Sequence, residues 1–327
     1  MAAQGSPRVG PDRRFVYDAA VAVISTTGLT MQFGSQRALD SLNIEVPNGV
    51  TGLVGANGAG KTTLMSIALG LRTHSAGSIK VLGLDPHRDG ARLRALVGYG
   101  PERNVLPEDM PASDFVKHFA EVRGMPRSEA KGRASDALWL VGLGEERFRA
   151  LGTMSTGQRQ RVKLAQAIAA DPRLVLLDEP TDGLDPVQRD EMLLLIKQIS
   201  AEYEIDVMLS SHLLEEVERV CDHIVALDAG TLVAQGELSA LIGDTEMILV
   251  DLVEVDDQPD AIDGVERRLR AAGFDVHRDL NRISVTGADQ RTTLDAIRDS
   301  VAAERARLRR IEVGRRTLED LFTEVRQ

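Results

Sequence analysis

The stretch Gly55-Ala-Asn-Gly-Ala-Gly-Lys-Thr62 (GANGAGKT) decides the fold, because its glycines, lysine and threonine have the spacing of a phosphate-binding loop. Glycines let backbone N–H groups curl around an anion, and the N-terminus of a following helix adds partial positive charge. We expect Lys61 to reach the β- and γ-phosphates of a nucleotide and the Thr62 hydroxyl to ligate Mg²⁺. The alternative is a glycine-rich turn. Against it, Val50–Val54 predicts a strand before the loop and Thr62–Leu69 a helix after it.

Around this loop, short apolar runs alternate with longer helical stretches. Arg173–Asp178 contains an apolar run of the kind that is buried on both faces of a parallel sheet, and Asp206–Ser211 is another. The alternation extends from about Val21 to Gly236 and predicts an α/β layered domain.

One part of this region lacks strand signals. Between about Pro101 and Leu151 the segments Ala112–Arg123 and Ser128–Val141 are amphipathic. Their apolar positions include Phe115, Phe119, Ala120, Leu138 and Val141. We interpret this part as a helical insertion on the α/β core.

After Gly236 the pattern changes to one of strands and helices in a smaller unit. The predicted strands are Met247–Val255, Arg282–Gly287 and Arg309–Gly314, and the predicted helices are Ala261–Ala272, Arg291–Arg305 and Thr317–Val325. This alternation can close into a small α+β sandwich of ferredoxin-like type.

Composition narrows the possible functions. The chain of 327 residues has a net charge of −11 and a pI near 5.1, which argues against a nucleic-acid surface. Cys221 is the only cysteine, so no internal disulfide can form. No apolar run approaches the ~18 residues needed to span a bilayer. Arg13-Arg14 resembles a twin-arginine signal, but flanking aspartates favour a flexible tail over residues 1–20.

Acidic residues end one of the predicted buried strands. Asp178 is placed to hold a metal ion, and Glu179 to polarise an attacking water near the γ-phosphate. An acidic pair at a strand end is often only a helix N-cap. Here the strand is expected to end at the same sheet edge as the phosphate loop, because ligands of such sheets gather at strand carboxyl ends. The catalytic interpretation is therefore favoured.

Two more residues follow strands near that edge. His212 comes directly after Asp206–Ser211, so we expect it to contact the γ-phosphate, although a lone histidine is more often a helix-start or core residue. Phe33 ends an early strand and could stack on adenine, with a plain core aromatic as the alternative.

A second glycine-bearing helix start lies in mid-chain. Ser155 and Gln158 have the spacing of a capping box, which predicts a helix from Thr156 to about Ala170. The first amides of that helix and Gly157 form a second candidate anion site. One chain cannot easily bring both sites onto one phosphate. Two chains packed head to tail can.

Together these residues resemble the nucleotide-binding subunit of an ABC transporter, over roughly Ser25–Gly236. By resemblance, the motifs are Walker A at Gly55–Thr63, Walker B at Leu174–Pro180, the signature at Met154–Gln158, the D-loop at Gly183–Asp185, the H-loop at His212 and the A-loop at Phe33. Within the family, Ser210–Gly236 and Arg316–Phe322 are similar to the bacterial daunorubicin-resistance type of exporter ATPase.

The resemblance implies a cofactor set, catalytic residues and partners. Glu179, His212 and Lys61 are the implied catalytic residues, with Mg²⁺ held by Thr62, Glu102 and Asp178. The implied ATP-binding residues are Phe33, Gly55, Asn57, Gly58, Ala59, Gly60, Lys61, Thr62, Thr63, Ser155, Gly157, Gln158 and Asp185. The implied partners are a membrane permease and a second ATP-binding subunit, identical or homologous, at the cytoplasmic face of the membrane.

The implied domains are a P-loop cassette of ABC type over residues 21–243, with a helical subdomain at about 104–156, and an accessory α+β domain over 244–327. Two positions depart from the family pattern. Thr156 replaces a signature glycine, so its side chain either crowds the partner's γ-phosphate or donates to it. Glu102 stands where the family has glutamine, and its added charge predicts hydrolysis that is slower or more dependent on the metal.

Two other functions compete with energy coupling for an exporter. A soluble ABC ATPase of translation carries two cassettes, and one of DNA repair carries long coiled coils, and neither pattern is present in the sequence. A regulatory nucleotide-binding module without turnover is the third possibility, and Glu179 and His212 speak against it.

Overall fold

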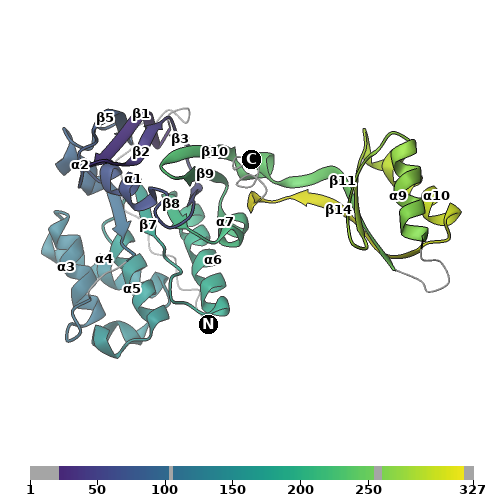
Figure 1. Ribbon diagram of the computed structural model, residues 1–327. Helices are drawn as coiled ribbons and strands as arrows, with labels where there is room; N and C mark the ends of the chain where they lie inside the picture. The colour runs from purple at the N-terminus through teal and green to yellow at the C-terminus, as the bar shows by residue number, and fades with distance from the viewer. Residues whose placement is uncertain (1–21, 103–105, 254–259, 320–327) are drawn as a thin grey trace. The chain divides into compact units, whose positions relative to one another are not determined.

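The computed structural model describes residues 22–102, 106–253 and 260–319 (Figure 1). As far as the described residues go, the chain divides into two compact units. The first contains residues 1–212 and 225–232, and the second contains 213–224 and 233–327. The boundary predicted near residue 243 lies inside the second unit and stays a prediction. The predicted tail over residues 1–20 lies outside the described residues.

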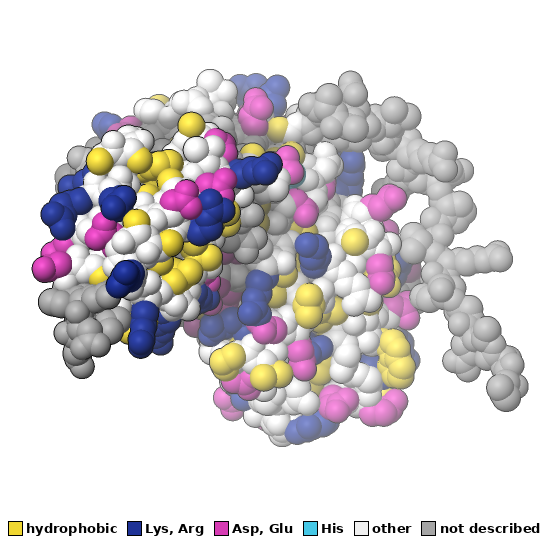
Figure 2. Space-filling model, turned by 90° about the vertical axis from the view of Figure 1, so that its right-hand side faces the viewer, with side chains coloured by type: hydrophobic (Ala, Val, Ile, Leu, Met, Phe, Trp, Pro, Cys, Tyr) yellow, Lys and Arg dark blue, Asp and Glu magenta, His cyan; other side chains and the backbone are white. Residues whose placement is uncertain are grey.

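Two further observations concern the apolar character of the helices and the distribution of charge on the surface. Within the described residues, no helix combines the length and the apolar character that crossing a bilayer requires. Figure 2 shows Lys and Arg side chains interspersed with Asp and Glu on the visible face, rather than gathered into one basic patch.

A six-stranded sheet with the order β10-β9-β4-β8-β7-β6 organises the nucleotide-binding part. Its strands are β4 (Val50–Val54), β6 (Val97–Gly100), β7 (Leu174–Asp178), β8 (Asp206–Ser211), β9 (His223–Asp228) and β10 (Thr231–Glu237). The strands β4, β8, β7 and β6 are parallel. The buried apolar runs predicted β4, β7 and β8, whereas β6 was not predicted. Val54 pairs with Ser211 and Asp178 with Ser210, so these strands end at one edge.

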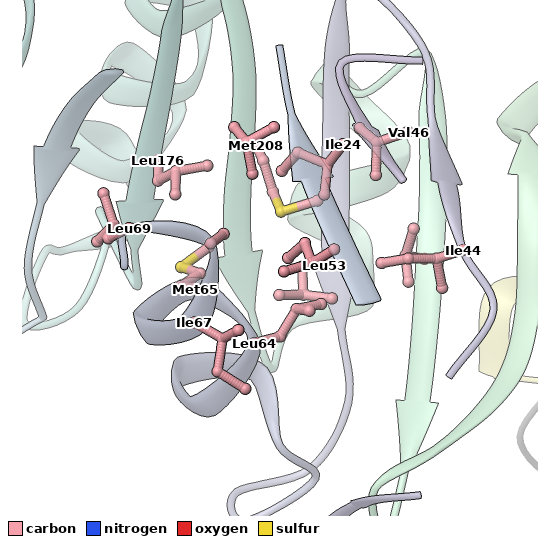
Figure 3. Close-up of a cluster of buried hydrophobic side chains, with 14 of the residues drawn as sticks. Ile24, Ile44, Val46, Leu53, Leu64, Met65, Ile67, Leu69, Leu176 and Met208 are labelled. Carbon is pink, nitrogen blue, oxygen red and sulfur yellow. The ribbon is translucent and has the colours of Figure 1, made fainter. Parts of the chain in front are cut away.

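A second, four-stranded sheet was not predicted from the sequence. It consists of β1 (Ile24–Phe33), β2 (Gln36–Leu42), β3 (Glu45–Val46) and β5 (Ala76–Val81). Strands β2, β3 and β5 each pair antiparallel to β1. Helix α1 (Lys61–Ala68) contacts β2 and β5. Side chains of both sheets and of α1 form one buried core (Figure 3). Its members include Ile24, Val46, Leu53, Leu64, Met65, Leu176 and Met208. This core fixes the phosphate loop, which lies between β4 and α1.

The segment predicted to be a helical insertion contains α3 (Ala112–Val122) and α4 (Arg127–Leu140), which pack on each other and on α5 (Thr156–Ile168). The rings of Phe115 and Phe119 lie 4.9 Å apart between centroids, and Phe115 is buried. The remaining helices are α2 (Gly90–Leu96), α6 (Pro186–Tyr203), α7 (Leu214–Val220) and α8 (Leu238–Leu241), and two 3-10 turns span Glu145–Phe148 and Leu151–Thr153.

The C-terminal elements confirm the ferredoxin-like prediction. The order along the chain is β11 (Gly243–Val253), α9 (Ala261–Ala271), β12 (Asp275–Asp279), β13 (Arg282–Thr286), α10 (Gln290–Ala303) and β14 (Arg307–Arg316). The antiparallel sheet has the order β12-β13-β11-β14, which is that of a split β-α-β fold. Strand β12 was not predicted, and most of the predicted helix Thr317–Val325 lies outside the described residues.

Gly98 tests how tightly the signature helix packs on the parallel sheet. A Cβ at Gly98 on β6 would lie 2.3 Å from the carbonyl oxygen of Ala167 on α5. We expect Gly98→Ala to destabilise the domain by about 1–3 kcal/mol, because this backbone contact cannot relax without moving the helix. Thermal unfolding followed by circular dichroism measures the effect.

Gly132→Ala is the matched control. Gly132 lies in α4 with no neighbour within 4 Å of the added methyl group. We expect it to stabilise the helix by about 0.5–1 kcal/mol. Equal melting temperatures for the two variants would contradict the tight packing of α5 on β6.

Candidate functional site

The phosphate loop has a backbone that only glycine accommodates at two positions. Gly60, the N-cap of α1, has a φ of 106°, and a Cβ there would lie 2.8 Å from the carbonyl oxygen of Ala38. At Gly55 a Cβ would lie 2.3 Å from the carbonyl oxygen of Leu227. By contrast, the exposed Gly58 has nothing within 4 Å of its Cβ position, so the loop is open on that side. These features fit a cradle for a phosphate group.

The other loop residues predicted to bind ATP also divide between a packed inner side and an open outer side of the loop. Asn57 and Thr62 are exposed, and Ala59 is buried. Ala59 also accepts a hydrogen bond at its carbonyl oxygen from the N–H of Gly230, at 3.1 Å. Thr63 is half-buried in the first turn of α1. The loop is therefore anchored on its inner side and accessible at Asn57, Gly58 and Thr62.

Lys61 lies buried between the loop and the acidic strand end. Its Nζ donates to the carbonyl oxygen of Gly55 at 2.7 Å and is 3.3 Å from Oε1 of Glu179. The other carboxylate oxygen of Glu179 is 2.8 Å from Nδ1 of His212. Because an ionised carboxylate only accepts hydrogen bonds, Nδ1 is the donor. The structure thus brings the three predicted catalytic residues into one connected chain.

Glu179 is held in an uncommon backbone conformation. Its φ is 48°, in the left-handed region that costs a residue with a side chain free energy. Such strain persists only where the surroundings impose it, and it concentrates at functional sites. Here the Glu179 N–H donates to Oγ of Ser210 at 2.9 Å.

Ser210 is a site residue that the sequence analysis missed. Its hydroxyl donates to Oδ1 of Asp178 at 2.7 Å while it accepts from the N–H of Glu179. The side chain is fully buried on β8, in register with Asp178. Its place two residues before His212 on a predicted strand was the available signal, but only the strand register shows what it contacts.

The candidate metal ligands come from three places in the fold: Thr62 from the first turn of α1, Glu102 from the loop after β6 and Asp178 from the end of β7. Asp178 is buried, Thr62 is exposed and Glu102 is half-buried after β6. Burial raises the pKa of Tyr99 to about 12, and the nearby carboxylates of Asp178 and Glu102 add to the effect. Both carboxylates are therefore close enough to act on one phenol.

This donor set suits Mg²⁺ bound together with a nucleotide. Across the described ranges, no group of three or more His, Cys, Asp or Glu side chains could hold a metal ion by itself. Magnesium in nucleotide sites is typically held by one or two carboxylates, a hydroxyl, water and the phosphates. The oxygen donors of Thr62, Asp178 and Glu102 fit that pattern.

The predicted start of the signature helix is confirmed. Oγ of Ser155 accepts from the N–H of Gln158 at 3.2 Å, and Oε1 of Gln158 accepts from the N–H of Ser155 at 3.1 Å. Ser155 and Thr156 are exposed, whereas Gly157 is buried. Oε1 of Gln188 lies 2.8 Å from where a Cβ of Gly157 would be, so glycine permits this approach.

The remaining predicted ligands have structural contacts of their own. Asp185 is the N-cap of α6, and its Oδ1 accepts from the N–H of Gln188 at 2.9 Å. Phe33 is 40% exposed at the end of β1, and the guanidinium of Arg72 lies 5.1 Å from its ring centroid. A half-exposed ring that already attracts a flat cationic group is suited to stacking, and its contact with adenine stays a prediction.

A parallel sheet with a phosphate loop after one strand and a paired acid after another defines a P-loop nucleotide hydrolase. The sequence profile of the ABC transporter family matches residues 39–182. The bacitracin transport ATP-binding protein BcrA of Bacillus licheniformis is 32% identical over 258 residues, which cover 79% of this chain and 83% of that protein. The chain belongs to the ABC transporter family and is an ATP-hydrolysing, ATP-binding subunit of a transporter.

Two further similarities extend this assignment. The daunorubicin/doxorubicin resistance ATP-binding protein DrrA of Streptomyces peucetius is 28% identical over 306 residues, 91% of each chain. Among solved structures, cbiO1 of Clostridium perfringens, part of the ABC transporter complex cbiONQ, superposes with a TM-score of 0.61 at 27% identity. That match covers 66% of this chain and 89% of cbiO1. The match to DrrA covers a larger share of this chain than the matches to BcrA and cbiO1 do.

Ser210→Ala tests the bridge between the two acidic residues. The change removes a donor to Asp178 and leaves the N–H of Glu179 without its acceptor, which costs about 1–3 kcal/mol of stability. We expect kcat for ATP hydrolysis to fall by about tenfold or more, because Glu179 loses its fixed position. Steady-state ATPase assays, together with thermal unfolding, measure both effects.

The matched control is Ser128→Ala, at an exposed position of α4. It should leave kcat unchanged. A Ser210→Ala protein that melts at a lower temperature but keeps its full kcat would restrict Ser210 to a structural role.

Proposed function

We propose that the chain powers export through a separate permease, and that each ATP is clamped between two cassettes packed head to tail. The Lys61–Glu179–His212 chain supports this proposal, because a cation and a carboxylate lie side by side at the sheet edge next to the phosphate loop. The names of relatives support the export direction, since BcrA is described by bacitracin transport and DrrA by daunorubicin/doxorubicin resistance.

In the proposed cycle, the triphosphate enters the loop and Lys61 moves from the Glu179 carboxylate to the β- and γ-phosphates. Glu179 then accepts a hydrogen bond from the attacking water, and His212 holds the other oxygen of the same carboxylate. Thr62, Asp178 and Glu102 would hold Mg²⁺, which would supply positive charge to offset that of the phosphates. The strained backbone at Glu179 keeps the carboxylate directed to this place without reorganisation.

The second half of the site would come from another subunit. Ser155 and Thr156, at the start of α5, are exposed in this chain, and the helix N-terminus favours an anion. A second copy, or a close homologue, would present these groups to the γ-phosphate bound at Gly55–Thr62. The methyl carbon of Thr156 lies 3.3 Å from the Cβ position of Gly183, which directs the methyl group to the D-loop.

The permease is expected to contact the helical insertion near Phe115–Leu138. The Phe115 and Leu138 side chains themselves are buried, in a region where α3, α4 and α5 pack together. A charge at Phe115 would disrupt the fold of the insertion rather than a docking surface. Such docking would place the subunit at the cytoplasmic face of the membrane. Nucleic acid is not an expected partner, given the net charge of −11.

Glu179→Gln is the decisive variant. The amide cannot act as a base, so we expect kcat to fall by about 10²–10⁴-fold while ATP still binds. Because the clamp forms but does not hydrolyse its ATP, the variant should dimerise with saturating ATP and Mg²⁺. Light scattering after size-exclusion chromatography, with the permease present, measures the dimer.

The control for this experiment is Glu129→Gln, at an exposed position of α4, which should hydrolyse ATP normally. A Glu179→Gln protein that stays monomeric under these conditions would refute the two-subunit clamp. Full turnover in Glu179→Gln would instead refute the assignment of the base.

Glu102→Gln tests the metal assignment separately. The change keeps an oxygen donor for Mg²⁺ but removes the negative charge beside the triphosphate, which is the charge expected to make hydrolysis more dependent on the metal. We therefore expect the Mg²⁺ concentration for half-maximal ATP hydrolysis to fall by about threefold or more. Titration of Mg²⁺ at fixed ATP measures this, and an unchanged titration would remove Glu102 from the metal site.

A further inference from the structure

The signature helix α5 holds the loop that carries Glu102. Nζ of Lys163, on α5, donates to the carbonyl oxygen of Glu102 at 2.8 Å and to that of Pro101 at 3.2 Å. Both carbonyl groups follow β6, which ends at Gly100. A single ammonium therefore fixes the backbone at the point where the strand pairing stops.

The same face of α5 also holds the segment that leads into the D-loop. Gln160 lies three residues before Lys163, so the two side chains share one face of the helix. Nε2 of Gln160 donates to the carbonyl oxygen of Asp182 at 3.0 Å. Gln160 and Lys163 line a small pocket together with Asp178. Helix α5 is thus hydrogen-bonded both to the loop after β6, which carries Glu102, and to the segment after β7, at Asp182.

Two carboxylates act on the ammonium of Lys163. Burial lowers the pKa of Lys163, and the carboxylates of Asp182 and Glu102 oppose this effect. The cation is half-buried, so solvent and salt screen it less than they screen an exposed lysine. Its charge therefore acts on the neighbouring Glu102 carboxylate.

We propose that Lys163 is a positioning residue that anchors the backbone of Glu102 and offsets the charge of the carboxylate found here in place of the family's glutamine. A carboxylate beside a triphosphate repels it, whereas an amide does not. The cation of Lys163 reduces that repulsion, and its hydrogen bonds hold the backbone of Glu102 in place. This inference rests on the proposed position of Glu102 beside the nucleotide.

The test is a double-mutant cycle of Lys163→Met and Glu102→Gln, with Lys131→Met on the exposed face of α4 as the control. Equilibrium binding of ATP is measured in EDTA, where the charge beside the triphosphate is not neutralised by metal. Hydrogen exchange of the peptide that contains Gly98–Glu102 is measured in the nucleotide-free protein. Neither readout depends on turnover.

Lys163→Met is expected to weaken ATP binding in EDTA by about 3- to 10-fold in the native background, and by less than about twofold beside Glu102→Gln. It should also accelerate exchange in the Gly98–Glu102 peptide, while Lys131→Met changes neither quantity. Lys163→Arg keeps a cation with several donors, so it should restore most of the ATP affinity. This conservative variant also covers the case in which Lys163→Met folds poorly.

Equal losses of affinity in both backgrounds, or no loss in either, would overturn the charge-offset role. Unchanged exchange in Lys163→Met would overturn the anchoring role. The Mg²⁺ titration of Glu102→Gln alone reports on the metal assignment, so failure of that assignment is distinguishable from failure of this inference.

Discussion

The register of the parallel strands is the constraint on which the catalytic edge depends. Because Val54 pairs with Ser211 and Asp178 with Ser210, the phosphate loop, the acidic pair and His212 emerge side by side. The buried Ser210 hydroxyl then joins the two acidic residues to β8. A slip of one residue in β8 would direct this hydroxyl to the opposite face of the sheet. The geometry of the site is therefore a consequence of sheet pairing as much as of its motifs.

Much of this arrangement could be predicted because its signals are local. The capping box at Ser155 is complete within four residues, and both of its hydrogen bonds are present. The strands β4, β7 and β8 are buried on both faces and therefore have apolar runs with clear limits. The ferredoxin-like unit was predicted from the alternation of its elements, although β12 was missed, because Asp275–Asp279 contains mostly charged residues.

The missed features depend on contacts between distant residues. Strands β1 and β2 have irregular burial and shifts in register, so they lack a clean period of two. Ser210 and Lys163 have unremarkable sequence surroundings, and only the packing of β8 on β7 and of α5 on β6 assigns them partners. The burial of Phe115 could not be predicted, because amphipathicity alone does not distinguish an outer face from the face that packs on neighbouring helices.

The ion pair between Lys61 and Glu179 has a consequence for the proposed mechanism. The Lys61 ammonium and the His212 ring contact the two oxygens of the Glu179 carboxylate. In that mechanism, the carboxylate becomes free to accept a hydrogen bond from water only when a phosphate draws the ammonium away. The same cation would then recognise ATP and suppress premature activation of water, so substrate recognition and the switching on of the catalyst would be a single event.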